Sequence, residues 1–137
     1  MRSRSLLLPA LLLAAAPASA ADDDEPIDCA HASSTVEMNV CAEQDFDVAD
    51  AKLNATYKKA LAHIGGRDLD PPFDRAGWEA ALRASQRAWL AFRDADCKGA
   101  VPMEWSGGTG TTAAVFTCLT AKTRTRIEEL ITRYEIR

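Results

Sequence analysis

The sequence lacks the motifs on which most enzyme classes depend. It has only two histidines, no Gly-x-Ser-x-Gly nucleophile turn, no His-Glu-x-x-His zinc motif and no phosphate-binding glycine loop. Acidic residues are plentiful, but a glycosidase must hold two carboxylates across a cleft, and the helical pattern described below leaves little room for one. We therefore expect no catalytic residues, no metal, no cofactor and no enzymatic activity.

Lysine and arginine are too few for a nucleic-acid surface. The 137 residues contain 16 Lys and Arg against 20 Asp and Glu, which gives a net charge of −4 at pH 7. Phosphate binding needs clustered basic residues, so nucleic acid is not an expected partner. An acidic surface would attract a cationic protein at long range, or would serve only to keep the protein soluble.

Residues 1–20 have the composition of a cleavable bacterial signal peptide. Arg2 and Arg4 precede an apolar run over 6–13, and Ala18-Ser19-Ala20 fits the small-residue cleavage pattern. The run is too short to span a bilayer of about 30 Å, and no cysteine follows Ala20 to accept a lipid. We predict an exported product, periplasmic or extracellular, with no membrane anchor after cleavage. Loss of the two arginines lowers its net charge from −4 to −6.

Residues 21–33 form an acidic N-terminal arm, and residues 34–137 are predicted to form one helical domain. Ser34-Thr35-Val36-Glu37 is a capping box that begins a long helix, and Gly65-Gly66 supplies a left-handed stop. Apolar or small residues recur at steps of three and four between these ends, which indicates one buried face. That face comprises Met38, Ala42, Phe46, Ala49, Leu53, Tyr57, Leu61 and Ile64.

Two further helices follow. Asp74 is a good N-cap for a second helix that reaches about Cys97, and a third runs from about Thr112. Between them, 100–110 is rich in glycine and contains Pro102, so we expect an irregular Gly-rich loop there. No strand pattern and no repeat is present. The sequence therefore predicts an all-α, three-helix up-down-up bundle.

Four cysteines, Cys29, Cys41, Cys97 and Cys118, predict two disulfides in an exported chain. The helix order gathers all four at one end of the bundle. The sequence-local pairs Cys29–Cys41 and Cys97–Cys118 are our first expectation, but crossed pairing of Cys41 with Cys97 and Cys29 with Cys118 is also geometrically possible. A zinc site of Cys29, His31 and Cys41 is disfavoured, because the spacing matches no usual ligand pattern.

Several charged and amide side chains lie next to the apolar helix faces. Buried charges are tolerated when they are paired, so these residues are predicted to form an inter-helix polar network. Its candidate members are Glu37, Asp50, Asn54, Gln86, Arg93, Asp94 and Arg126. The alternative is a small-molecule pocket that uses Asp50, Asn54, Trp89 and Arg93.

A series of spaced motifs carries a family resemblance over about residues 29–130. They are Thr35-x-Glu37-x-Asn39-x-Cys41, Asp50-x-x-Leu53-Asn54-x-x-Tyr57, Gln86-Arg87-x-Trp89-x-x-Phe92-Arg93-Asp94-x-x-Cys97 and, after Cys118, Thr123-x-x-Arg126-x-x-x-Leu130. In this order they resemble the lysozyme-inhibitor LprI-like family of small exported bacterial domains. The resemblance implies a protein-binding module whose partner is a cationic lysozyme. The family's namesake is a lipoprotein, whereas this chain lacks the lipid-accepting cysteine.

The segment 101–110 is the candidate partner-binding loop, with Met103, Glu104 and Trp105 as its contact residues. A tryptophan on an exposed loop is typical of a binding hot spot, and such a loop could enter an enzyme's cleft. Alternatively, Trp105 folds back to cover the end of the bundle. The competing function is a cell-envelope structural or interaction module without lysozyme activity.

Overall fold

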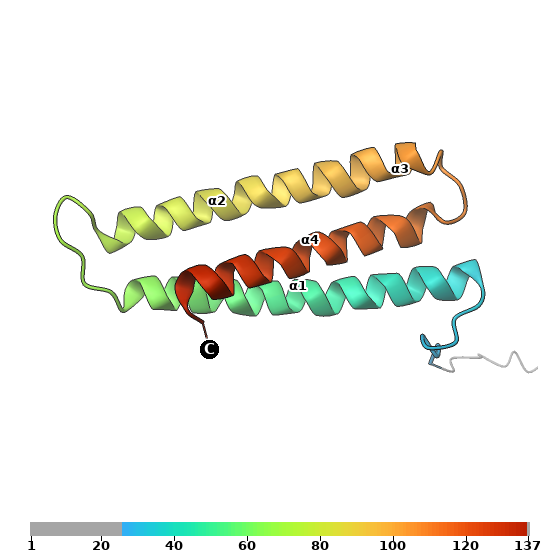
Figure 1. Cartoon of the computed structure of the whole chain (residues 1–137), viewed down its shortest axis with the longest axis horizontal. Helices are drawn as coiled ribbons and strands as arrows, with labels where there is room; N and C mark the ends of the chain where they lie inside the picture. Colours follow the sequence, from blue (N-terminus) through green and yellow to red (C-terminus); the bar gives the residue numbers. More distant parts are fainter. Residues whose placement is uncertain (1–25, 137) are drawn as a thin grey trace, which may run out of the picture.

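The computed structural model describes residues 26–136, and these form three helical rods that run up, down and up (Figure 1). Helix α1 spans Thr35–Gly65, α2 spans Arg75–Ala95, and α4 spans Thr111–Tyr134. No strand occurs among these residues, so the predicted all-α bundle is confirmed. None of the described helices is long and apolar enough to cross a membrane. The predicted signal peptide over 1–20 lies outside the described residues.

The second rod is longer than the sequence predicted. Helix α2 continues without a break through a π-helical turn, η1 (Asp96–Ala100), into the short helix α3 (Val101–Glu104). The expectation of an irregular loop from residue 100 is therefore wrong, and only residues 105–110 connect α3 to α4. Proline has no N–H to donate, and Pro102 is accommodated where the π turn already interrupts the regular ladder of hydrogen bonds.

Local capping fixes where α1 and α2 begin. The Ser34 hydroxyl accepts from the Glu37 N–H (3.2 Å), and the Glu37 carboxylate accepts from the Ser34 N–H (2.8 Å), which confirms the capping box. The Asp74 carboxylate accepts from the Gly77 N–H (2.6 Å) at the start of α2. Helix α1 ends at the predicted glycine pair, but Gly66 has φ −87°, so the expected left-handed stop is wrong.

The three rods are unequally spaced. The backbones of α1 and α4 approach each other closely along their length, while α2 stands farther from both. Small side chains such as Ala49, Thr56 and Ala60 are buried on α1, where they permit this close approach. Helix α2 instead presents bulky side chains, among them Trp78 and Trp89. The apolar core lies toward the end that holds the α1–α2 connection. It consists of Leu53, Ala60, Ile64, Leu82, Ile127, Leu130 and Tyr134.

Candidate functional site

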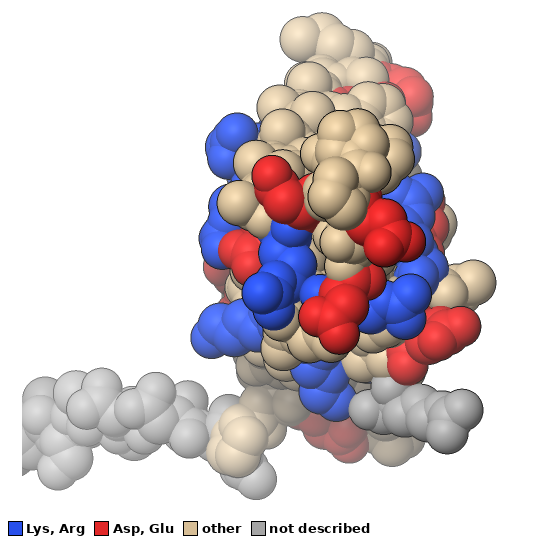
Figure 2. Space-filling view, turned by 90° about the vertical axis from the view of Figure 1, so that its left-hand side faces the viewer, with Lys and Arg blue, Asp and Glu red and all other residues tan. Residues whose placement is uncertain are grey.

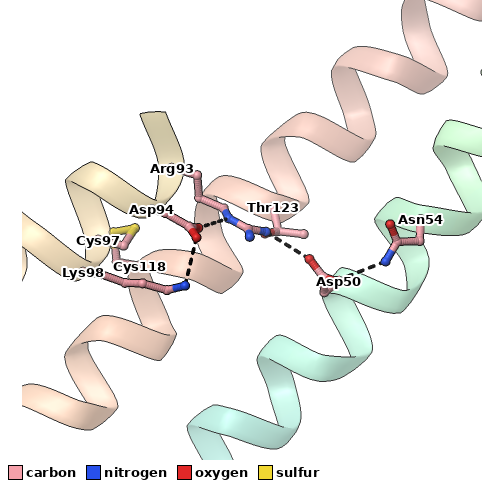
Figure 3. Close-up of polar contacts among 8 residues, drawn as sticks. All are labelled: Asp50, Asn54, Arg93, Asp94, Cys97, Lys98, Cys118 and Thr123. Atoms are coloured by element: carbon pink, nitrogen blue, oxygen red, sulfur yellow. Dashed lines mark hydrogen bonds and ion pairs between the residues drawn. A yellow bond between two sulfur atoms is a disulfide. The ribbon is translucent and has the colours of Figure 1, made fainter. Parts of the chain in front are cut away.

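A buried arginine on α2 holds the three helices together near the middle of their length (Figure 3). Arg93 is only 6% exposed. Its Nη1 donates to Asp50 Oδ1 of α1 (3.0 Å) and to Thr123 Oγ1 of α4 (3.1 Å). Asp50 also accepts from the Asn54 amide (3.1 Å). One guanidinium therefore fixes the relative position of all three helices, because its donors have a rigid planar arrangement.

The Arg93 guanidinium also holds its neighbour on α2. Its Nε donates to Asp94 Oδ1 (3.0 Å), and the other carboxylate oxygen of Asp94 accepts from Lys98 Nζ (2.9 Å). Burial raises the pKa of Asp94, but the hydrogen bonds from Lys98 and Arg93 outweigh it. The net pKa of Asp94 is lowered. Asp94 therefore stays ionised and keeps the charge of Arg93 paired.

A second buried arginine repeats this arrangement between α4 and α2. Arg126, also 6% exposed, donates from Nε to Gln86 Oε1 (3.1 Å), from Nη2 to Ser85 Oγ (3.1 Å) and from Nη1 to Glu129 Oε2 (2.9 Å). The Trp89 ring lies near both guanidinium groups, with its centroid 5.3 Å from Arg93 Cζ and 5.9 Å from Arg126 Cζ. Cation–π attraction therefore supplements the hydrogen bonds.

The structure brings six of the seven candidate network residues into these two arginine clusters. Glu37 is the exception, because it stands in the first turn of α1 and its carboxylate accepts the backbone N–H groups of Ser33 and Ser34. Grouping it with the network was wrong. Thr123, Ser85 and Glu129 complete the clusters, and only the first of these stands in a motif that the sequence singled out.

A hollow of about 370 Å³ lies beside the Arg93 cluster, between α1 and α2. Asp50, Asn54 and Arg93 line it together with Tyr57 and Arg87, whereas Trp89 does not. Three of the four residues of the alternative small-molecule pocket therefore share one wall. Asp50 and Arg93 are already paired with each other there.

The predicted local disulfides, Cys29–Cys41 and Cys97–Cys118, are confirmed. The first ties the N-terminal arm to α1, and the second ties the π turn to the start of α4. Asp96 brings a carboxylate close to Cys97 and Cys118, but those sulfurs are bonded to each other and offer no thiolate for a metal. His31 pairs with Asp28 (2.7 Å) instead of joining Cys29 and Cys41.

The candidate contact residues lie at the cysteine end of the bundle. Met103 is 80% exposed, and Glu104, the last residue of α3, is also exposed. Trp105 is 50% exposed, and its ring packs on Gly110, where an added Cβ would come within 2.5 Å of the indole. Trp105 thus lies along the connection and neither projects freely nor covers the core.

Trp105 forms one wall of a groove of about 760 Å³ that the sequence did not reveal. Helices α1, α3 and α4 all contribute to it. Its lining residues are Thr35, Met38, Asn39, Val101, Glu104, Trp105, Thr109, Gly110, Ala113, Ala114, Thr117, Cys118 and Ala121. Met38 belonged to the predicted core face but is 45% exposed. The small side chains of Ala113, Ala114, Thr117 and Ala121 on one face of α4 are the signal that could have indicated a hollow, because they cannot fill the space between the helices.

The opposite end of the bundle has a different surface. Figure 2 shows uncharged residues gathered on the upper part of this end, with basic and acidic residues interspersed below. A hollow of about 440 Å³ lies beside Phe73, Trp78 and Pro72, and Phe73 is 74% exposed. The mixed charges of this end give it no field of one sign with which to attract a charged partner.

These features define a small all-α domain that is held together by two disulfides and two buried arginine clusters. Residues 28–130 match the family model described as lysozyme inhibitor LprI, and the chain belongs to this family. The resemblance carried by the motifs is thereby confirmed. The family is one of inhibitors and not of enzymes.

One relative covers almost the whole chain. It is the uncharacterized protein R02472 of Rhizobium meliloti (strain 1021), which is 39% identical over 135 residues, or 95% of this chain and 94% of the relative. No solved structure matches the chain.

Proposed function

We propose that this chain is an exported protein-binding module that inhibits a cationic lysozyme. The match of residues 28–130 to the lysozyme-inhibitor family is the observation that carries this proposal. The two disulfides fit an exported protein, because such bonds persist in oxidising compartments. The net charge of −6 expected for the exported product favours encounter with a basic enzyme.

The cysteine end, with Met103, Glu104 and Trp105, is the proposed contact surface. Exposed Met and Trp side chains stand there beside an unfilled groove, and large exposed apolar groups next to a cavity are typical of protein interfaces. The opposite end also exposes Phe73 but has no uniform charge. It therefore serves as the internal comparison in the test.

The test is inhibition of purified lysozymes of the C, G and I types by the exported, oxidised product of the full chain. We expect loss of cell-wall lysis at micromolar protein for at least one type. Trp105→Ala should weaken inhibition about ten-fold or more, as for a hot-spot residue. Phe73→Ala removes an aromatic that is even more exposed, 74% against 50%, from the other end and should leave inhibition unchanged.

The outcomes separate the proposal from its competitor. Failure to inhibit any of the three types would overturn the lysozyme proposal and favour an envelope interaction module. If inhibition were lost in Phe73→Ala but kept in Trp105→Ala, the contact surface would lie at the Phe73 end of the bundle and not at the cysteine end. Reduced and alkylated protein controls for non-specific binding of an unfolded acidic chain.

A further inference from the structure

The groove beside Trp105 is apolar along its walls and nearly free of charge. Met38 and Val101 line it together with Trp105, and alanines of α4 form much of the remaining surface. Its volume of about 760 Å³ is large enough for a long side chain of a partner. The segment 101–110, which the sequence suggested as an insert, contributes Val101, Glu104, Trp105, Thr109 and Gly110 to the lining of the groove.

Two polar features distinguish the groove from a purely apolar cleft. Glu104 is the one charged residue in its lining, and its carboxylate forms no hydrogen bond or ion pair with another described residue. Asn39 Oδ1 is buried and has no hydrogen-bond partner among the described residues. Both groups accept hydrogen bonds, and the Glu104 carboxylate is the exposed one that a ligand at the rim can reach.

The charge of the groove has one sign. No lysine, arginine or histidine lines it. Glu104 is also the last residue of the helix that runs through α2, η1 and α3, and the carboxyl-terminal end of a helix carries partial negative charge. An apolar stem that ends in a cation complements both the walls and the rim.

We infer that the groove receives a long cationic side chain, a lysine or an arginine, of the protein partner. The methylene stem packs on Trp105 and Met38, and the cation lies near Glu104. Such stems bury their methylenes on apolar surface while the charged head stays at the rim. This inference rests on the proposed function for the identity of the partner, because a lysozyme is a basic protein.

The start of α4 would favour an anion, whereas Glu104 favours a cation. The test must therefore compare ligands of both charges. Gly110 and Ala113 line the groove at this start, and no side chain caps the helix. Free N–H groups at a helix N-terminus favour an anion. A carboxylate of the same chain length is therefore the decisive competitor for a cation.

The experiment titrates the exported, oxidised protein with n-hexylammonium, 1-hexanol and hexanoate, followed by the NMR signals of the Trp105 indole N–H and the Asn39 side-chain amide. We expect the ammonium to bind about two- to five-fold more tightly than the alcohol, the range for an exposed ion pair. Hexanoate should bind most weakly. An n-butylguanidinium arm distinguishes arginine from lysine as the inserted residue.

Matched variants assign the preference to its residue. Glu104→Gln should remove the advantage of the ammonium over the alcohol, while Glu128→Gln makes the same change of charge on an exposed part of α4 outside the groove. Equal binding of all three probes, or tightest binding of hexanoate, would overturn the inference. The inference would also be overturned if Glu104→Gln still bound the ammonium more tightly than the alcohol.

The probes contain no lysozyme, so the two proposals fail separately. If the chain inhibits a lysozyme but shows no preference for the ammonium, the groove inference is wrong and the proposed function stands. If the ammonium is preferred as expected but no lysozyme is inhibited, the groove is a cation site and the proposed partner is wrong.

Discussion

The two halves of the bundle are stabilised by different interactions. Toward the α1–α2 connection, the interior is filled by aliphatic side chains, and Trp78, His63 and Tyr134 stack around its end with ring centroids 6.0–6.5 Å apart. Arg93 lies near the middle of the bundle, and Arg126 lies beside the aliphatic core. The other half carries both disulfides and has the groove at its end. Covalent cross-links are thus concentrated where apolar packing is incomplete.

The two halves therefore contribute differently to this small domain, one to its stability and the other to the shape of its surface. Apolar packing is non-directional and fills space, so the aliphatic half contributes stability without fixing a particular surface. The Arg93 hydrogen bonds at the middle of the bundle and the two disulfides fix the relative position of chain segments while leaving volume unfilled. The cysteine half can therefore hold an open groove in a defined shape, which a binding site requires.

The largest expected effect is in the aliphatic half. Leu130→Ala removes a fully buried side chain and should lower the free energy of unfolding by about 3 kcal/mol, within the range for core leucines. Val101→Ala, which trims a wall of the groove, should cost about 1 kcal/mol or less because that side chain is partly exposed. Urea denaturation measures both. Equal losses would mean that the groove wall is part of the core.

Next in size is the loss of a disulfide. The Cys97→Ala/Cys118→Ala pair opens a link across a sequence separation of 21, worth about 3 kcal/mol in the chain-entropy model, which is close to the loss expected for Leu130→Ala. The Cys29→Ala/Cys41→Ala pair should cost less, because the arm it ties down is mostly exposed. Thermal unfolding of the two double variants compares them, and equal losses would contradict this ranking.

Removal of the central arginine should have a smaller effect. Arg93→Met leaves Asp50 and Asp94 without their buried partner, but both carboxylates reach solvent, so we expect a loss of about 1–3 kcal/mol and not the full penalty of a buried charge. Arg83→Met breaks an exposed pair with Glu79 and should cost below about 0.5 kcal/mol. Chemical denaturation checks both.

A different result would change the role assigned to Arg93. If Arg93→Met is as stable as the parent protein, its hydrogen bonds to α1 and α4 specify geometry without adding net stability. Probe binding in the groove then measures whether that geometry is lost. A change in binding without a change in stability would support a positioning role for Arg93.

Much of the fold could be predicted because its signals are local. The capping box at Ser34, the N-cap at Asp74 and the spacing of apolar residues depend on neighbours within one or two helical turns. The helix order gathered the four cysteines at one end but left both the local and the crossed pairing possible, and the structure has the local pairs. The continuation of α2 through Pro102 was missed, because a π turn that accommodates a proline has no simple sequence signature.

The groove could not be predicted for a different reason. It forms where the side chains of three separate helices leave space unfilled, and Met38 and Asn39 of α1 line it together with residues of α3 and α4. The polar network could be predicted in part from the sequence, since Arg93 and Arg126 lie beside apolar helix faces. Its partners Ser85 and Glu129 are ordinary surface residue types and carry no signal of their own.

The smallest expected effect is a pH dependence confined to the cysteine half. The pKa of Asp94 is lower in the folded chain than its ordinary value, so its carboxylate adds stability above about pH 4. That contribution is lost as the pH falls through the lowered pKa and Asp94 takes up a proton. Asp94→Asn should therefore be less stable than the parent protein at pH 7, and the difference should shrink toward pH 2.

Urea midpoints of the parent protein and Asp94→Asn at several pH values measure this shift. Asp28 and Glu37 also have lowered pKa values, through hydrogen bonds from His31 and from the Ser34 and Ser33 backbone respectively, and they titrate in the same acid range. Only the difference between the two proteins therefore reports on Asp94. Asp68→Asn, in the α1–α2 connection, controls for the change in net charge. A difference that stays constant down to pH 2 would show that Asp94 acts through packing and not through its charge.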